Sequence, residues 1–256
     1  MKTESQVAIV TGAGRGVGKA VAKRIAGQGI AVGVLDIDLD NAQQVVAEII
    51  QEGGTAFAAL CNVGKRESVE TAIVQIENHF GATPLLLVNN AGVGGPFHRV
   101  DEVSDEEWEW IIDTNLRSVF LFARQLLPKM KAAGYGRIVN IASIQGLFGA
   151  ARSSTYVASK HGMIGYTKAI AAEWGPYGIT CNAICPGYVD TAMGVESSEV
   201  TDYLRKVLEK SPVKRIAQPA EIAAMVAFLL GPESGYINGA SITMDGGITS
   251  HVGISE

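Results

Sequence analysis

The sequence predicts an α/β fold, with a doubly wound parallel sheet flanked by helices on both faces. Short apolar runs alternate with amphipathic segments of helical spacing along the whole chain. Most of the apolar runs show no polar alternation, which is typical of parallel strands buried on both faces. Right-handed crossovers between such strands place helices on both sides of the sheet. No linker or repeat interrupts the pattern, so we expect residues 1–256 to form one domain.

Seven strands and six helices are expected in alternation. Apolar runs predict strands at residues 7–10, 31–35, 56–60, 85–88, 137–141, 180–184 and 241–244. Helical spacing of Val17, Ala20, Val21 and Ile25 predicts the first helix, and later helices are expected over 40–52, 68–80, 104–131, 155–174 and 220–230. Gly53 and Gly54 end the second helix, and Pro128 lies near the end of the fourth. The polar, weakly periodic stretch 190–219 is expected to be a lid over a site.

Composition excludes several classes of protein. Hydrophobic residues make up 47% of the chain, charged residues 18%, and the net charge is −5. An acidic chain without a basic patch is not expected to bind nucleic acid. No run approaches the roughly 20 apolar residues of a membrane span, and the N-terminus lacks a signal-peptide run. The three cysteines, Cys61, Cys181 and Cys185, have no zinc spacing, so we expect reduced core thiols, no metal and a cytoplasmic protein.

A glycine-rich turn follows the first expected strand and opens the first expected helix. The turn reads Thr11-Gly12-Ala13-Gly14-Arg15-Gly16-Val17-Gly18. Glycines permit the tight turn and the close approach of a phosphate, and the helix N-terminus offers free N–H groups. The turn has no Gly-Lys-Ser/Thr ending, so it is not a P-loop. We therefore expect a dinucleotide at Gly12, Arg15, Gly16, Val17 and Gly18.

The end of the second expected strand carries an acidic residue, Asp36. A carboxylate at this position binds the adenosine ribose hydroxyls and repels a 2′-phosphate, which favours NAD over NADP. Arg15 argues in the other direction, because a cation in the turn could receive that phosphate.

Tyr156 and Lys160 lie four residues apart, on one face of an expected helix, thirteen residues after Ser143. An ammonium beside a phenol favours the phenolate and lowers its pKa from about 10. A serine hydroxyl at the same place can hold a carbonyl or alcohol oxygen. The alternatives are a solvated helix face for Tyr156 and Lys160 and a turn-capping role for Ser143.

Together these residues resemble the short-chain dehydrogenase/reductase family, over Val7 to Gly247. Further matches are Asn89-Asn90-Ala91-Gly92 after the fourth strand, Asn115 in the long helix, and Pro186-Gly187 with Thr191 after the sixth strand. The resemblance implies a Rossmann-like fold, a homotetramer, and a nicotinamide cofactor. It places cofactor contacts at Asn62, Val63, Asn89, Ala91, Gly92, Tyr156, Lys160, Pro186, Gly187, Val189 and Thr191. The family often has Asp-Val where this chain has Asn62-Val63, and the asparagine carbonyl can still accept a hydrogen bond from the adenine amino group.

The resemblance also implies the reaction, which is hydride transfer between NAD(H) and a secondary alcohol or ketone. Tyr156 would exchange the hydroxyl proton. Lys160 would lower the pKa of Tyr156 and bind the nicotinamide ribose. Ser143 would polarise the substrate oxygen, and Asn115 would help to hold a water that links Lys160 to solvent. Asn115 could instead be a buried amide that only satisfies backbone groups. A protein of another class, a nucleotide-binding scaffold that has lost catalysis, would usually lack the tyrosine or the lysine.

The substrate is less well defined by the sequence. Family positions place the pocket at Gly94, Gln145, Arg152, Ser153, Tyr188 and Met193, a mix that suits a medium-sized ketone or secondary alcohol. Arg152 and Gln145 could instead meet the carboxylate of a 3-hydroxy acid. A third candidate is an NADPH-dependent 3-oxoacyl thioester reductase, which Asp36 disfavours. Trp108 and Trp110 are interpreted as packing or interface residues, and Phe120 and Ala169 as candidates for a subunit interface.

Overall fold

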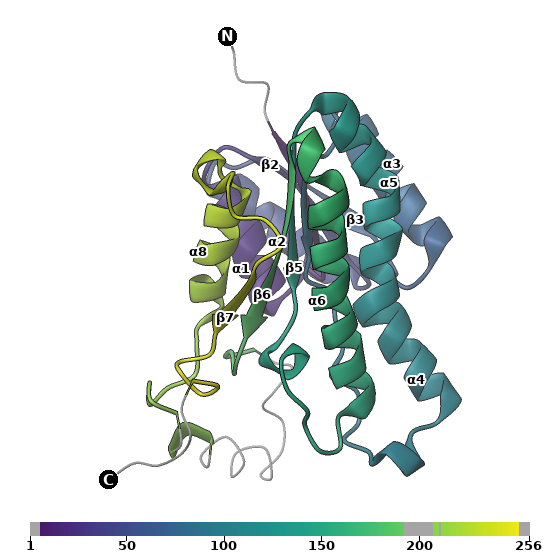
Figure 1. Ribbon diagram of the computed structural model, residues 1–256. Coiled ribbons are helices and arrows are strands. Elements are labelled where there is room, and N and C mark those ends of the chain that lie inside the picture. The colour runs from purple at the N-terminus through teal and green to yellow at the C-terminus, as the bar shows by residue number, and fades with distance from the viewer. Residues whose placement is uncertain (1–5, 192–206, 210, 251–256) are drawn as a thin grey trace.

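The computed structural model describes residues 6–191, 207–209 and 211–250. Seven parallel strands form one sheet in the order β3-β2-β1-β4-β5-β6-β7 (Figure 1). The strands are β1 Val7–Thr11, β2 Ala31–Asp36, β3 Ala56–Leu60, β4 Leu86–Asn89, β5 Gly136–Ile141, β6 Ile179–Pro186 and β7 Ser241–Met244. The predicted doubly wound, seven-stranded parallel sheet is therefore confirmed.

Helices cover both faces of the sheet, as Figure 1 shows. One face carries α1 Gly16–Ala26, α2 Leu39–Gln51 and α8 Pro219–Leu230, which share a hydrophobic core with β1 and β2. The other face carries α3 Arg66–Phe80, α4 Asp105–Ile112, α5 Ser118–Ala133 and α6 Ser154–Trp174. Short 3₁₀ turns lie at Val100–Glu102, Ile144–Gly146, Gly175–Tyr177 and Pro232–Ser234.

The strand order reverses between β1 and β4. The chain runs outward from β1 through β2 to β3 and then returns to place β4 on the other side of β1. Loops that leave the carboxyl ends of β1 and β4 therefore diverge to opposite faces and open a crevice between them. Ligands of doubly wound sheets bind at such a reversal point. The topology thus puts the glycine turn after β1 and the Asn89–Gly92 loop after β4 at the same crevice.

The long helix expected over 104–131 is interrupted. A π-helical turn, Asp113–Arg117, separates α4 from α5. π-turns insert an extra residue into a helix and occur frequently at functional sites. Here the turn contains Asn115, whose side chain is buried and bonds to the loop after β4 rather than to its own helix.

Candidate active site

A cavity of about 450 Å³ opens at the carboxyl edge of the sheet, around the crevice between β1 and β4. Its walls come from the loops after β1 to β6 and from α4 and α6. It brings together these predicted residues: Gly12, Arg15, Gly16, Val17, Asp36, Asn62, Val63, Ala91, Gly92, Ser143, Tyr156, Lys160, Pro186, Gly187, Tyr188, Val189 and Thr191. Residues as far apart as 12 and 191 in the sequence thus face one space.

The glycine turn forms a close-fitting cradle at one end of the cavity. Gly12 has a φ of +60°, and a Cβ there would lie 2.8 Å from the Cα of Ala91. Asn90 holds the turn in place, because its Nδ2 donates to the carbonyls of Thr11 at 2.9 Å and Gly12 at 3.0 Å. The cradle ends at the N-terminus of α1, where unpaired N–H groups favour an anion. The residues present therefore fit a dinucleotide pyrophosphate.

Gly18 does not line the cavity, although the sequence placed it among the cofactor contacts. It is buried in the first turns of α1, where a Cβ would lie 2.2 Å from the Gly12 carbonyl oxygen. Gly18 therefore allows the helix to approach the turn closely, and it supports the cradle from behind.

Asp36 lines the cavity at the carboxyl end of β2 and is held by the backbone. Its Oδ2 accepts a hydrogen bond from the Gly14 N–H at 2.8 Å, and its Oδ1 accepts one from the Asp38 N–H at 3.1 Å. Both carboxylate oxygens are thus oriented before any ligand binds. Arg15 lies in the same cavity and is exposed.

Ser143, Tyr156 and Lys160 meet at the other end of the cavity. Ser143 follows β5 and caps the 3₁₀ turn, where its Oγ accepts from the Gln145 N–H at 3.1 Å. The Ser143 side chain also hydrogen-bonds to Tyr156. The same hydroxyl therefore caps the turn and contacts Tyr156, so the capping role does not exclude the role that the resemblance implies.

Burial shifts the pKa values of Tyr156 and Lys160 in opposite directions. Burial raises the pKa of Tyr156 above its ordinary value, and the hydrogen bond with Ser143 only opposes this rise. Burial also lowers the pKa of Lys160 to about 8. The lysine Nζ donates to the Ile141 carbonyl at 2.8 Å and lies 5.5 Å from the centroid of the phenol ring. The pKa of Tyr156 is therefore raised overall because desolvation dominates, and Lys160 is not among the causes of the shift. The lowering of the Tyr156 pKa by Lys160 stays a prediction.

Asn115 lies behind the cavity wall and is fully buried. Its Oδ1 accepts from the Val93 N–H at 2.8 Å, and its Nδ2 donates to the Val93 carbonyl at 2.9 Å and to Ser159 Oγ at 3.2 Å. The amide thus satisfies backbone groups, as one sequence alternative held. Asn115 and Lys160 both lie close to Gly92. A Cβ added to Gly92 would lie 3.2 Å from Asn115 Oδ1 and 3.6 Å from Lys160 Nζ.

Asn89 has a structural position rather than a place in the cavity wall. It is buried at the end of β4, and its Nδ2 donates to Asn140 Oδ1 on β5 at 2.8 Å. Asn140 in turn donates to Thr167 Oγ1 on α6 at 2.9 Å. This buried chain of amides ties two strands to the helix that carries Tyr156 and Lys160.

Of the five predicted substrate-pocket residues that the structure describes, only Tyr188 lines the cavity. Gly94 and Arg152 are exposed, and Ser153 is buried at the start of α6. Arg152 has a φ of +62°, and its Nε donates to the Phe97 carbonyl at 3.0 Å. The guanidinium therefore joins two surface loops. Gln145 follows Ser143 but is absent from the lining, and Met193 lies outside the described residues.

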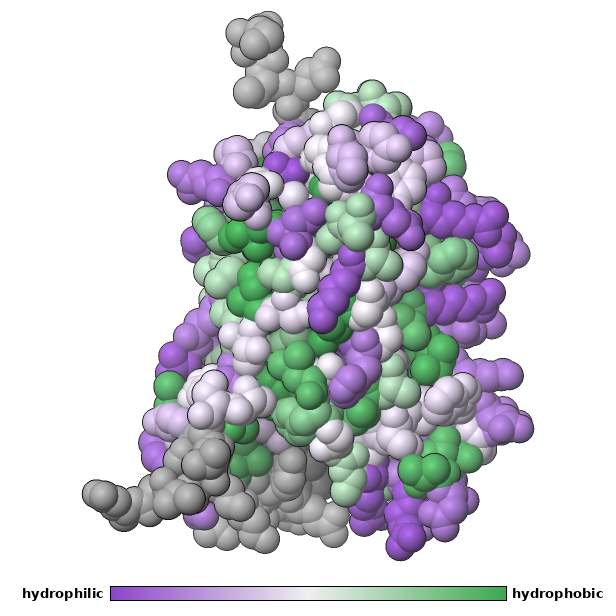
Figure 2. Space-filling view, in the orientation of Figure 1, coloured by the Kyte–Doolittle hydropathy of each residue, from purple (hydrophilic) through white to green (hydrophobic). Residues whose placement is uncertain are grey.

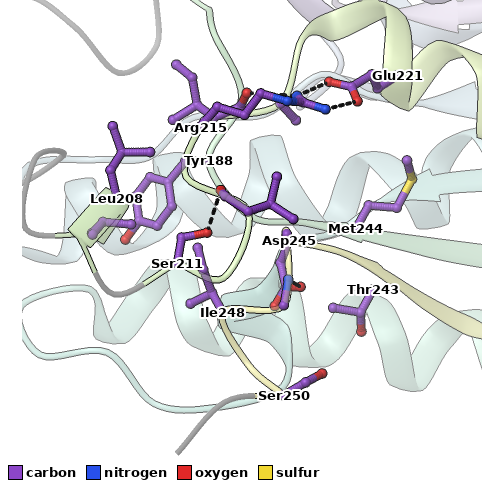
Figure 3. Close-up of a pocket in the computed structure, with 16 residues that line it drawn as sticks. Tyr188, Leu208, Ser211, Arg215, Glu221, Thr243, Met244, Asp245, Ile248 and Ser250 are labelled. Atoms are coloured by element: carbon purple, nitrogen blue, oxygen red, sulfur yellow. Dashed lines mark hydrogen bonds and ion pairs between the residues drawn. The ribbon is translucent and has the colours of Figure 1, made fainter. Parts of the chain in front are cut away.

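A second cavity, of about 420 Å³, lies on the other side of Tyr188. Figure 3 shows Tyr188 and Leu208 on one side of it and Met244, Asp245 and Ile248 on another. Its rim carries an ion pair, in which Arg215 donates to both oxygens of Glu221 at 2.7 and 2.8 Å. Val189 and Ala217, near the two ends of the predicted lid, pair as an isolated parallel bridge. Described residues from 207 onward in the 190–219 stretch therefore border this second cavity, whereas Thr191 lines the first.

Several cavity residues were missed by sequence reasoning. They are Ile37, Cys61, Asn90, Trp110, Thr114, Ile141 and Ala142. Asn90 belongs to the recognised Asn-Asn-Ala-Gly motif, and the others are neighbours of predicted residues. Trp110 is the exception, because nothing in its local sequence separates it from a packing residue.

Two further findings concern the described part of the chain. It contains no group of three histidine, cysteine, aspartate or glutamate side chains that could hold a metal ion. Among the helices described, none has the length and apolar character needed to cross a membrane.

The fold and the cavity define a class of protein. A dinucleotide cradle at the reversal point of a doubly wound sheet lies beside a serine, a tyrosine and a lysine that can exchange a proton with an alcohol or carbonyl oxygen. These features are those of an oxidoreductase that uses a nicotinamide cofactor.

Comparison with known proteins places the chain more narrowly. A family model described as Enoyl-(Acyl carrier protein) reductase matches residues 12–249. A cyclohexanol dehydrogenase from Acinetobacter sp. (strain SE19) is 41% identical over 97% of each chain. A 3-oxoacyl-(acyl-carrier-protein) reductase from Vibrio cholerae is 36% identical over 97% of this chain and 99% of its own. The crystal structure of levodione reductase superposes with a TM-score of 0.91 at 31% identity, covering 96% of this chain and 98% of that chain.

The protein belongs to the short-chain dehydrogenase/reductase family. It is an NAD(P)-dependent oxidoreductase of alcohols and ketones.

Proposed function

We propose that this protein oxidises a medium-sized alicyclic secondary alcohol to its ketone, with NAD as the preferred cofactor. The observation that carries the proposal is that Ser143, Tyr156 and Lys160 share one cavity with the glycine cradle and Asp36. The cyclohexanol dehydrogenase named above supports an alicyclic substrate. The lining of this cavity also includes Val93, Ala142 and Tyr188, which suit a largely apolar ring.

The cofactor, when bound, accepts or returns the hydride, and the chain's residues handle the proton. Tyr156 removes the hydroxyl proton during oxidation and returns it during reduction. Ser143 donates a hydrogen bond to the substrate oxygen and holds it next to the phenol. Because burial keeps the phenol protonated, oxidation should become faster as the pH rises and ketone reduction should become slower.

Lys160 and Asn115 are proposed to complete the proton path. Lys160 donates to the ribose hydroxyls of the cofactor and passes the proton onward from Tyr156. With its pKa lowered to about 8, the ammonium can give up a proton near neutral pH more readily than an ordinary lysine. The small residue Gly92 leaves space between Asn115 Oδ1 and Lys160 Nζ, and a water there would connect the lysine with solvent.

Asp36 is the basis for proposing NAD. Its oriented carboxylate would accept hydrogen bonds from both adenosine ribose hydroxyls and would repel a 2′-phosphate. A structure of an actinorhodin polyketide ketoreductase, 34% identical with a TM-score of 0.91, contains NADPH, so the family includes proteins that bind the other cofactor. The 36% identical 3-oxoacyl reductase makes NADPH-dependent reduction of a 3-oxoacyl thioester the second candidate.

A substrate panel tests the proposal. Purified enzyme is assayed with NAD and with NADP on cyclohexanol, an aryl alcohol, a polyol, 3-hydroxybutyrate and, in the reducing direction, an acetoacetyl thioester. The highest kcat/KM is expected for cyclohexanol with NAD. A higher value for the thioester with NADPH would establish the second candidate instead. Tight NADH binding without turnover of any substrate would indicate a nucleotide-binding scaffold.

A homotetramer is proposed from an apolar groove between the α4–α5 segment and α6. The groove is lined by Ile112, Leu116, Arg117, Phe120, Gly162, Gly165, Tyr166 and Ala169. In Figure 2, hydrophobic side chains appear among charged ones on the face that carries α6. Small residues on α6 let a helix of a second copy approach closely, and the side chain of Phe120 is 39% exposed and available to fill the groove of that copy. Phe120→Glu should reduce the mass measured by light scattering, whereas an unchanged mass would refute this interface.

A cytoplasmic location is proposed from the cysteines. Cys61, Cys181 and Cys185 are free and buried. Burial raises their thiol pKa values to about 11, 12 and 11 respectively, so the reactive thiolate is suppressed. Cell fractionation with a tagged chain tests the location, and recovery outside the cytoplasm would refute it.

A further inference from the structure

We propose that Trp110 is an additional cofactor-binding residue, which covers the adenine ring of the bound dinucleotide. This inference rests on the proposed use of a nicotinamide dinucleotide. Trp110 lies on α4, lines the dinucleotide cavity, and has a side chain that is 51% exposed. The sequence interpretation of this residue as packing or interface is therefore revised.

The neighbours of Trp110 fix which end of the cavity it borders. Thr114, four residues further along the same helical segment, also lines the cavity. The adjoining Asp113 packs on the loop after β3, since a Cβ at Gly64 would lie 3.4 Å from Asp113 Cβ. That loop carries Asn62 and Val63, on the Asp36 side of the glycine cradle. Trp110 therefore stands over the adenosine end rather than over the Ser143 and Tyr156 end.

The adenosine end has the chemistry that a purine requires. Ile37, just after Asp36, is 69% exposed and lines the same cavity, so it offers an apolar surface for one side of the ring. Trp110 offers a flat aromatic surface on the other side. Asn62 supplies a side-chain amide that can pair with the edge of the base. Two large exposed hydrophobic side chains in one cavity are costly in water, and a stacked purine would cover both.

Trp108 provides a matched control on the same helix. It is 46% exposed, but it does not line the cavity and lies two residues away, on a different face of α4. Replacing either exposed tryptophan removes similar apolar surface. Any general effect on folding should therefore appear in both variants, whereas an effect on the adenine contact should appear only at position 110.

The test uses ADP-ribose, which contains the adenosine and pyrophosphate but no nicotinamide. Isothermal calorimetry on the full-length protein gives its Kd for wild type, Trp110→Ala, Trp110→Phe and Trp108→Ala. Base–aromatic stacking is worth about 1–3 kcal/mol, so Trp110→Ala should weaken binding roughly tenfold or more. Trp110→Phe should recover most of the affinity, and Trp108→Ala should bind like wild type. Quenching of tryptophan fluorescence by ADP-ribose should decrease strongly only in the position-110 variants.

The outcomes separate this inference from the function on which it rests. If wild-type protein fails to bind ADP-ribose, the proposed dinucleotide function is wrong. If wild type binds and Trp110→Ala binds equally well, the adenine contact is refuted. If Trp110→Ala leaves ADP-ribose affinity unchanged but raises the substrate KM, Trp110 belongs to the substrate side, and the inference is likewise refuted.

Discussion

The choice of cofactor is expected to depend on one carboxylate. Asp36→Asn removes the negative charge while keeping the size of the side chain. In the wild type, both oxygens accept backbone hydrogen bonds, at 2.8 Å from Gly14 and 3.1 Å from Asp38. The carboxylate cannot easily turn away from an incoming phosphate, because doing so would leave both N–H groups without acceptors.

The size of the effect follows from electrostatics. Two unit charges about 4 Å apart repel by about 4 kcal/mol at an effective dielectric constant of 20. Asp36 is partly exposed, so salt reduces this repulsion, and a remaining value of about 3 kcal/mol corresponds to a factor of about 10². Asp36→Asn should therefore lower the ratio of kcat/KM for NAD to kcat/KM for NADP by about that factor. Loss of hydrogen bonds to the ribose should also lower kcat/KM for NAD by about tenfold.

The assay is steady-state kinetics with each cofactor at several salt concentrations. Asp38→Asn is the matched control, because Asp38 carries the same charge two residues away, caps α2 and does not line the cavity. The control should keep the wild-type cofactor ratio. The reasoning is refuted if Asp36→Asn leaves the ratio within threefold of wild type, or if Asp38→Asn changes it equally.

Three further predictions concern the same cavity. Tyr156→Phe should lower kcat by about 10²–10⁴ while NADH affinity, measured by fluorescence titration, stays near wild type; retention of more than a few per cent of activity would contradict the role of the phenol. Lys160→Met should raise the free energy of unfolding at pH 7, because burial lowers the lysine pKa from 10.5 to about 8 and the charged lysine is therefore destabilising. The gain should be on the order of 3 kcal/mol, reduced by the loss of the hydrogen bond to the Ile141 carbonyl. Between pH 8 and 10.5 the lysine binds a proton in the unfolded chain but not in the folded chain, so the stability of the wild type rises relative to that of the variant. If the difference between their melting temperatures does not shrink over this range, the buried charge is contradicted. Gly18→Ala should weaken ADP-ribose binding at least tenfold and lower the melting temperature, because its Cβ would meet the Gly12 carbonyl at 2.2 Å, whereas Gly94→Ala, which meets nothing within 4 Å, should do neither.

Local sequence patterns predicted most of the fold. Buried parallel strands appear as uninterrupted apolar runs, so the strands were placed to within two residues at either end. The π-turn at Asp113–Arg117 could not be predicted, because its cause is tertiary. The Asn115 side chain bonds to Val93, which is distant along the chain and close only after folding.

The predicted residues face the cavity where a motif is contiguous, and fewer of them do so where the prediction depends on side-chain direction. Gly12, Gly16 and Val17 line the cavity, while Gly18 supports it from behind. Asn89 is the last residue of β4 and Asn90 follows it, and their side chains bond to different parts of the fold. One of them enters the buried network with Asn140, and the other anchors the glycine turn.

The sequence by itself was enough to predict the class of reaction, because the glycine turn, Asp36 and the Tyr156-x-x-x-Lys160 pair each predict a function from short-range spacing. Only the tertiary structure decided how these groups behave. Burial sets the pKa values of Tyr156 and Lys160, and burial is a property of the whole packed domain rather than of any segment. The structure also decided that Trp110 lines the cavity and Trp108 does not, because what a face of α4 contacts depends on the elements that pack around the helix.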